Sequence, residues 1–291
     1  MSLKYIVGEQ LVVRVTNHGN ELRQPVPIRR GAMMDRSVVE TGFLGPSPPR
    51  KIVRVSITAP LTWIKGGIGD FLQAPLLSLF FGGVFAGMFY LGSELFLAAS
   101  GPRLGYLAWL AFLIPFLVAG VNAAGRDLEG GRMPKVLNSI GILWIRKAYL
   151  ALFSLMVTAL ILGWVRLTAQ IFVVYTNSAV ISTDTARTLL ADPHGLIAVG
   201  FFTLITMLVA LFIFFGSAVA LPLVLDGDAE FINAMITSYQ ATIQNPRAML
   251  LWAALVFILT TMGIAAWYIG LALVFPILSY ASWRSYRDLV R

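Results

Sequence analysis

The pattern that decides the fold occurs twice: Gln73-Ala74-Pro75 begins one copy and Gln244-Asn245-Pro246 begins the other. Two apolar stretches follow each start, and the second stretch holds a proline, Pro115 or Pro276, eleven residues before an Arg-Asp-Leu sequence. Those two sequences are Arg126-Asp127-Leu128 and Arg287-Asp288-Leu289. A repeat built on apolar runs of membrane length is typical of an internally duplicated membrane protein. The sequence therefore predicts an internal repeat of residues 73–128 and 244–289, related by an axis along the membrane normal.

The composition agrees with a membrane protein. Hydrophobic residues make up 58% of the chain, charged residues only 12%, and the mean hydropathy is +0.79. A soluble domain carries about 25% charged residues. Because this chain has too little polar surface to face water, we expect most of it to face lipid or other buried helices.

Residues 1–55 differ from the rest of the chain. They contain scattered prolines and arginines and no sustained periodicity, which predicts a mostly irregular cytoplasmic N-terminal tail. Residues 9–16 alone suggest a short strand. Residues 56–291 are predicted to form a six-span membrane domain.

The spans follow from the length of the apolar runs, since a crossing needs about 20 apolar residues. The last two of the six lie in one run of 36 residues. As one helix that run would be ~54 Å long, too long for a ~30 Å hydrocarbon core. A tight hairpin between Gly263 and Tyr268 is expected, and a single bent helix is the alternative. The six spans are 76–99, 104–123, 148–171, 196–222, 248–265 and 267–283.

An amphipathic stretch precedes each pair of spans, at 61–72, 136–144 and 231–243. Apolar residues recur there with helical spacing, and each stretch is too short to cross a bilayer. Helices of this kind lie in the membrane interface. The predicted fold is therefore all-α: a polytopic membrane bundle of six transmembrane helices, arranged as three hairpins with interfacial amphipathic helices.

The basic residues predict the orientation. If the N-terminus is inside, all but three of the 22 Lys and Arg residues are also inside, the exceptions being Arg103, Arg166 and Arg187. The positive-inside rule then places both termini in the cytoplasm. The formal net charge of +8 is explained by contacts with anionic lipid, and no nucleic-acid partner is expected.

Several short motifs, taken in order, resemble an uncharacterised bacterial inner-membrane family, domain of unknown function 2189, over about residues 53–290. The resemblance implies a polytopic protein of a bacterial inner membrane and implies no activity. The motifs are Ile57-Thr58-Ala59-Pro60-Leu61-Thr62-Trp63, Leu221-Pro222-Leu223-Val224-Leu225-Asp226, Gln244-Asn245-Pro246, Leu251-Trp252-Ala253-Ala254-Leu255 and Trp283-Arg284-Ser285-Tyr286-Arg287-Asp288-Leu289.

Members of that family sometimes carry an oxidase-subunit label, but the residues argue against a catalytic subunit. Haem and copper need several histidines inside the spans, and this chain has only His18 and His194. It has no cysteine and none of the common motifs of hydrolases, nucleotide-binding enzymes or metalloproteases. We therefore expect no cofactor, no metal and no enzymatic activity.

Glu94 and Arg166 are the charges placed deepest in the predicted spans, each 18 residues from the start of its span. An ionisable residue inside a membrane is costly and by default suggests a functional site. They form a candidate intramembrane charge pair. The alternatives are that each side chain snorkels to the outer interface or that the two pair only for structure.

Two further features have a functional and a structural interpretation. Arg126 and Arg287, in the Arg-Asp-Leu sequences, are possible lipid headgroup contacts, or they simply mark the cytoplasmic ends of spans. Asp226, Asp228 and Glu230 fit a cation site or, more simply, the N-terminus of the helix at 231–243.

Small residues mark sites where helices can approach closely. Gly83 and Gly87 form a GxxxG pair in the first span, and Gly120 with Ala124 is a similar pair in the second. We expect both pairs to support packing within the chain.

The function predicted from the sequence is non-catalytic: an accessory or scaffold protein contacting membrane lipids or a membrane protein complex. The alternative is a transporter or lipid-handling protein with a path between the repeats. A transporter needs a polar cavity that reaches the midplane, lined by residues such as Glu94, Arg166, Gln170 or Asn122. A scaffold needs a dry, closely packed centre.

Overall fold

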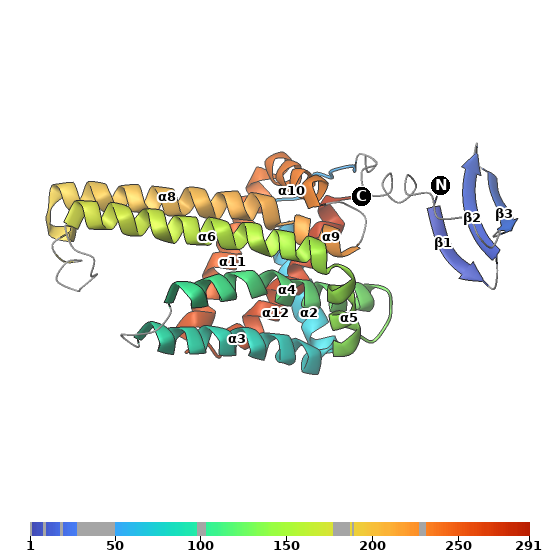
Figure 1. Cartoon of the computed structure of the whole chain (residues 1–291), viewed down its shortest axis with the longest axis horizontal. Coiled ribbons are helices and arrows are strands. Elements are labelled where there is room, and N and C mark those ends of the chain that lie inside the picture. The colour runs from blue at the N-terminus through green and yellow to red at the C-terminus, as the bar shows by residue number, and fades with distance from the viewer. Residues whose placement is uncertain are drawn as a thin grey trace. The chain divides into compact units, whose positions relative to one another are not determined.

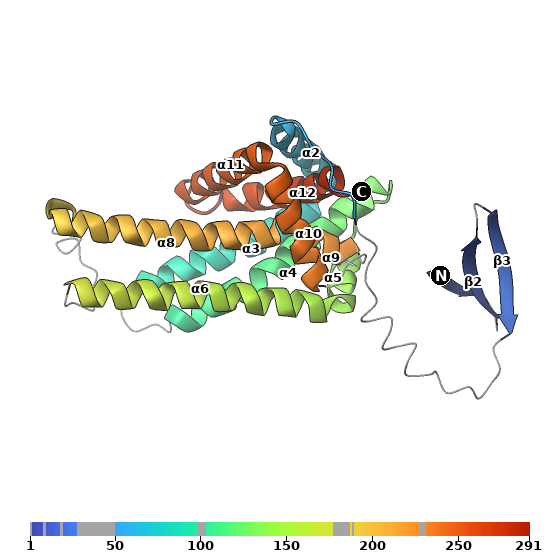
Figure 2. The ribbon, with the colours of Figure 1, turned by 90° about the horizontal axis from the view of Figure 1, so that it is seen from above.

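The computed structural model describes residues 2–7, 10–17, 20–27, 50–97, 103–176, 187, 189–226 and 231–291 (Figures 1 and 2). The chain divides into two compact units, Met1–Pro46 and Ser47–Arg291. Each unit is described by itself below.

The described residues of the first unit form a three-stranded antiparallel sheet in the order β1-β2-β3. The strands are β1 (Ser2–Val7), β2 (Gln10–Asn17) and β3 (Asn20–Pro27). The sequence predicted a mostly irregular tail, so this part of the prediction is corrected, although β2 coincides with the short strand suggested at 9–16. β-Branched residues in β2 favour the extended conformation. Pro25 lies in β3, an edge strand of this sheet, which is where proline occurs within sheets.

The second unit is built from helices in the predicted order. A short helix precedes each pair of long ones: α2 precedes α3 and α4, α5 precedes α6 and α8, and α10 precedes α11 and α12. We call these sets helix units one, two and three; helix unit two also ends in the short helix α9. The bounds are α2 (Ala59–Gln73), α3 (Pro75–Leu97), α4 (Arg103–Glu129), α5 (Val136–Ile145), α6 (Lys147–Thr176), α8 (Pro193–Ser217), α9 (Ala220–Asp226), α10 (Phe231–Gln244), α11 (Pro246–Ala265) and α12 (Leu271–Leu289).

A single residue separates each short helix from the long helix that follows: Ala74, Arg146 or Asn245. Pro75 and Pro246 begin the long helices, where a missing N–H costs little. The Asn245 side chain adds a tertiary bond, because its Oδ1 accepts the Val55 N–H at 2.9 Å and its Nδ2 donates to the Val53 carbonyl at 3.1 Å. Asn245, between α10 and α11, therefore holds the segment that leads into α2.

Among the described residues, five helices are long and apolar enough to cross a membrane, and α12 is not one of them. The five segments are Pro75–Glu94, Leu104–Glu129, Lys147–Val173, Pro193–Asp226 and Pro246–Ala265. α12 fails on composition because Arg284, Arg287 and Asp288 occupy its last turns. It also faces protein, since it packs against α2, α3, α4, α9 and α11, and a helix surrounded by other helices needs fewer lipid-facing apolar residues. The six-span arrangement remains a prediction.

The long apolar run near the C-terminus is a hairpin, as expected, and the bent-helix alternative is wrong. α11 ends at Ala265 and α12 begins at Leu271. Trp267 and Tyr268 in the turn have positive φ angles of 55° and 62°, which is uncommon for residues other than glycine. A Cβ on Gly270 would lie 2.8 Å from the Cα of Gly263, so the tight approach of the two helices requires glycine there.

The close contact between α3 and α12 depends on Gly82 rather than on the predicted GxxxG pair. A Cβ at Gly82 would lie 2.0 Å from the Ala272 carbonyl oxygen, whereas a Cβ at Gly83 or Gly87 would meet nothing within 4 Å. The prediction for Gly83 and Gly87 was wrong because it used spacing alone, which does not say which face of α3 meets α12. Gly120 does pack closely, since a Cβ there would meet the Phe81 ring.

The segment before α2 pairs with the end of α12. Ile52 forms an antiparallel bridge with Val290, and the Val53 N–H donates to the Leu289 carbonyl at 2.9 Å. The structure therefore divides the chain after Pro46, and residues 50–55 belong with the helices rather than with the predicted tail.

Candidate functional site at the junction of α2, α4 and α12

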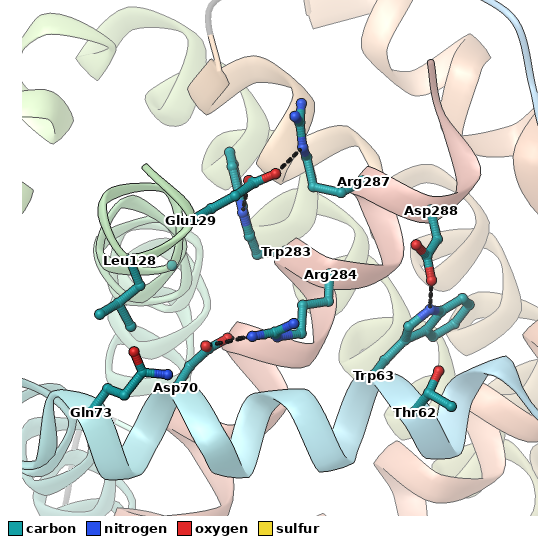
Figure 3. A pocket seen from close by; sticks show the side chains of 11 residues that line it. Thr62, Trp63, Asp70, Gln73, Leu128, Glu129, Trp283, Arg284, Arg287 and Asp288 are labelled. Carbon is teal, nitrogen blue, oxygen red and sulfur yellow. Dashed lines mark hydrogen bonds and ion pairs between the residues drawn. The ribbon is translucent and has the colours of Figure 1, made fainter. Parts of the chain in front are cut away.

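A cluster of polar side chains lies where α2 crosses the ends of α4 and α12 (Figure 3). They surround a pocket of about 430 Å³. We call this place the α2–α12 junction. Its charged lining residues are Asp70, Glu129, Arg284, Arg287 and Asp288.

Asp70 and Arg284 form the first link across the junction. The guanidinium donates two hydrogen bonds to the carboxylate, at 2.7 and 2.6 Å. Asp70 is only 4% exposed, so the pair satisfies a carboxylate that would be costly to bury alone. The hydrogen bond to Asp70 raises the pKa of Arg284 above its ordinary value and outweighs the opposing effect of partial burial. Gly66 leaves room for this side chain, because a Cβ there would lie 2.4 Å from the Arg284 Cδ.

Trp63 forms the second link. Its indole N–H donates to the Asp288 carboxylate at 2.7 Å. The ring is 1% exposed and meets Trp252 of α11 edge to face, with centroids 5.8 Å apart. α2 is thus fixed to both α12 and α11, so helix unit one is joined to helix unit three.

Glu129 forms the third link, between α4 and α12. It accepts hydrogen bonds from the Trp283 indole at 3.0 Å and from Arg287 Nε at 2.9 Å. Arg287 also lies 3.7 Å from Asp226, at the end of α9, and Asp226 accepts the Tyr286 hydroxyl at 2.9 Å. The ends of α4, α9 and α12 therefore meet at one end of the bundle.

This geometry indicates what the junction can do. Asp70, Glu129, Asp226 and Asp288 each accept a hydrogen bond from a side chain on another helix. Within the described parts of the chain, no group of three or more His, Cys, Asp or Glu residues could hold a metal ion. The arrangement suits a junction that holds helix ends together, and it presents charges of both signs to its pocket.

The two arginines predicted as lipid headgroup contacts lie in different environments. Arg287 belongs to the α2–α12 junction and contacts protein carboxylates. Arg126 is half-buried, and its Nε atom is buried with no hydrogen-bond partner among the described residues. Of the acidic cluster, Asp226 bonds to α12 and not to α10, while Asp228 and Glu230 lie outside the described residues.

The structure does not bring Glu94 and Arg166 together. Both side chains are exposed, and no salt bridge joins them in the described part of the chain. α4 lies between α3, which carries Glu94, and α6, which carries Arg166 (Figure 1). The candidate intramembrane pair therefore has no support in this geometry.

Sequence reasoning missed Asp70, Arg284, Trp63 and Glu129 as site residues. One signal was present: Trp63, Gly67 and Asp70 recur at helical spacing on one face of α2, and all three are buried. A carboxylate on the apolar face of an amphipathic helix predicts a buried partner. The identity of that partner depends on the crossing of α2 and α12, which spacing alone does not give.

The apolar helices and their polar junction define the class: this is an integral membrane protein with several apolar helices. Residues 106–226 match the model of the family described as a predicted integral membrane protein, domain of unknown function 2189. The resemblance noted from the sequence is thereby confirmed for these residues, which run from α4 to the end of α9. Of the motifs that suggested it, only Leu221–Asp226 falls inside the match. Neither the curated proteins nor the solved structures contain a match to the chain.

Proposed function

We propose that this protein is a non-catalytic accessory or scaffold protein of a bacterial inner membrane that contacts lipid or a membrane complex. One observation carries the proposal. The pocket of about 310 Å³ between the long helices is lined by apolar side chains and by the hydroxyls of Ser217, Thr260, Ser279 and Ser282, without a charged residue. A path for ions or polar solutes needs charged or strongly polar groups near the midplane.

The polar residues expected of a transporter do not line this pocket. The side chains of Glu94, Arg166 and Gln170 are exposed on the surface of the bundle. Asn122 is fully buried, and neither of its amide atoms has a hydrogen-bond partner in the described chain. These placements favour an apolar centre over a polar route.

The outer surface of α8 supports contact with lipid or with another membrane protein. Apolar side chains that are more than half exposed recur there at helical spacing, which makes one continuous stripe. They are Ile197, Phe201, Leu204, Leu208 and Phe212. A stripe of this kind is stable only against acyl chains or an apolar partner helix.

Purification tests the proposal. The protein is extracted from its native membrane in mild detergent, and mass spectrometry identifies the lipids and polypeptides that remain bound. We expect specific retained lipid, a partner polypeptide or both. Reconstituted vesicles serve as the opposing assay: solute or ion flux that requires the protein and is lost in Asn122→Ala would contradict the scaffold and favour a transporter.

Lipid handling is kept as a second candidate because one observation favours it. The same apolar pocket is lined by all of the long helices and is only partly enclosed. Transfer of labelled phospholipid between two vesicle populations would separate handling from simple binding.

A further inference from the structure

The long helices of the three helix units pack against one another in the same way at two of three places, and this packing is missing at the third. α6 of helix unit two packs along α4 of helix unit one, and α3 of helix unit one packs along α12 of helix unit three. In both cases the first long helix of a unit lies against the last long helix of another. The third such contact would join α11 to α8 and α9, and no comparable packing joins them in the described part of the chain. We call the space between α11 and the α8–α9 segment the open seam.

The short helices follow the same cyclic rule without exception. α5 packs on α4, α10 packs on α8 and α9, and α2 packs on α12. The ring of three units is therefore closed at the end that holds the short helices. The open seam is therefore a separation of α11 from α8 and α9, while the short helices still connect the three units at one end of the bundle.

The pocket of about 310 Å³ includes this seam and extends inward among the other long helices. Trp252, Val256 and Thr260 line it from one face of α11, spaced four residues apart. Phe214 and Leu221 line it from α8 and α9, and its remaining walls come from α12, α4, α6 and α3. The polar groups in the lining are hydroxyls, and the Ser279 hydroxyl already donates to the Phe275 carbonyl at 2.9 Å. Such a lining fits an uncharged, apolar occupant.

The size of the pocket decides what kind of apolar occupant fits. A helix is about 10 Å across, so 310 Å³ would hold only about 4 Å of its length, fewer than three residues. A partner helix or a second copy of this chain could cover the pocket but would not fill it. A hydrocarbon chain is much thinner. Lipid acyl chains surround α8 and α11 if these helices cross the membrane. We propose that the open seam binds an acyl chain of a membrane phospholipid.

Packing supplies the driving force. Moving an acyl chain from the bilayer into an apolar groove gains no hydrophobic free energy, because both surroundings are equally apolar. An empty groove would leave its walls without dispersion contacts, and water does not fill an apolar cavity. A chain in the groove restores these contacts. The proposal rests on the proposed function, to which it adds a location and a ligand class.

A groove-filling variant tests this site. Val256→Trp places a large side chain in the groove, and Phe257→Trp is the matched control, because Phe257 is the next residue and is 72% exposed. Native mass spectrometry of protein purified in mild detergent measures retained phospholipid. We expect Val256→Trp to lower retention by roughly tenfold, because the indole ring would overpack the space that the acyl chain needs, and Phe257→Trp to leave it unchanged. Gel filtration and the melting temperature confirm that both variants fold.

Thr260→Phe repeats the test at another position of the same face. If both groove variants fail to fold, the wild-type protein decides: a phospholipid with a photoreactive acyl chain must label Val256 or Thr260 in the retained complex. Equal retention in Val256→Trp and Phe257→Trp, or an absent label, would overturn the proposal. Loss of a bound polypeptide instead of lipid would also overturn it but leave the scaffold function in place.

Discussion

At the scale of single residues, the link between Asp70 and Arg284 shows how one charge pair joins distant parts of the chain. The carboxylate has a side-chain exposure of 5% and the guanidinium 44%. The two partners therefore differ in their access to solvent. Loss of Arg284 would leave the buried Asp70 carboxylate without its charged partner, whereas Arg284 alone can reach solvent.

This inequality predicts the effect of substitution. Arg284→Gln should lower the free energy of unfolding by about 1–3 kcal/mol, because Asp70 stays buried without its charged donor. Asp70→Asn combined with Arg284→Gln should recover part of the loss. Arg287→Gln is the control, since Arg287 and Glu129 are 48% and 44% exposed and such pairs contribute less than about 1 kcal/mol. Thermal unfolding in detergent measures all three, and an equal loss in the control would contradict the assignment.

Glu94 and Arg166 give a second prediction at this scale. Because both are exposed and no salt bridge joins them in the described chain, the changes in melting temperature of Glu94→Gln and Arg166→Gln should add in the double variant. Residues far apart without shared partners usually behave in this way. A double variant that is more stable than the sum of the single changes would restore the charge pair.

At the scale of elements, backbone approach rather than side-chain size controls how α3 meets α12. The Ala272 carbonyl fills the space that a side chain at Gly82 would need, while Gly83 faces open space. Two adjacent glycines on one helix thus serve different purposes.

A pair of alanine variants separates the two roles. Gly82→Ala should destabilise the protein by about 1–3 kcal/mol, because the helices must move apart. Gly83→Ala should be neutral or stabilising by up to about 1 kcal/mol, because alanine favours a helix over glycine. Denaturation in detergent compares the two. If Gly83→Ala proves the more harmful, α3 packs through the GxxxG face after all.

At the scale of the whole molecule, the contacts made by the end of α12 bear on the number of crossings. Arg287 contacts the end of α4 through Glu129 and the end of α9 through Asp226. All three helix units therefore end on the same side of the bundle, which is the arrangement expected if α12 completes a sixth crossing.

Labelling of single cysteines tests this topology, and the chain has no native cysteine to interfere. Lys135→Cys and Arg291→Cys should react from the cytoplasmic side, and Ile269→Cys, in the exposed turn before α12, from the other side. A five-span chain would instead place positions 135 and 291 on opposite sides, so that result would reject the six-span arrangement.

The sequence by itself determined the features that depend on local chain properties. The length of the apolar runs indicated the long helices, the periodicity of 61–72, 136–144 and 231–243 indicated the short ones, and the excessive length of the last run required a hairpin. The three-unit order followed from these. Each is a property of neighbouring residues, so no knowledge of distant contacts was needed.

Only the tertiary structure decided which residues meet. The partners Asp70 and Arg284 are 214 positions apart, and their pairing depends on α2 crossing α12. Depth along a span suggested Glu94 and Arg166 instead, but depth does not say which helices are neighbours. The open seam has the same origin: α8 and α11 are apolar helices like the others, and whether they pack against each other is set by the contacts of all three units together.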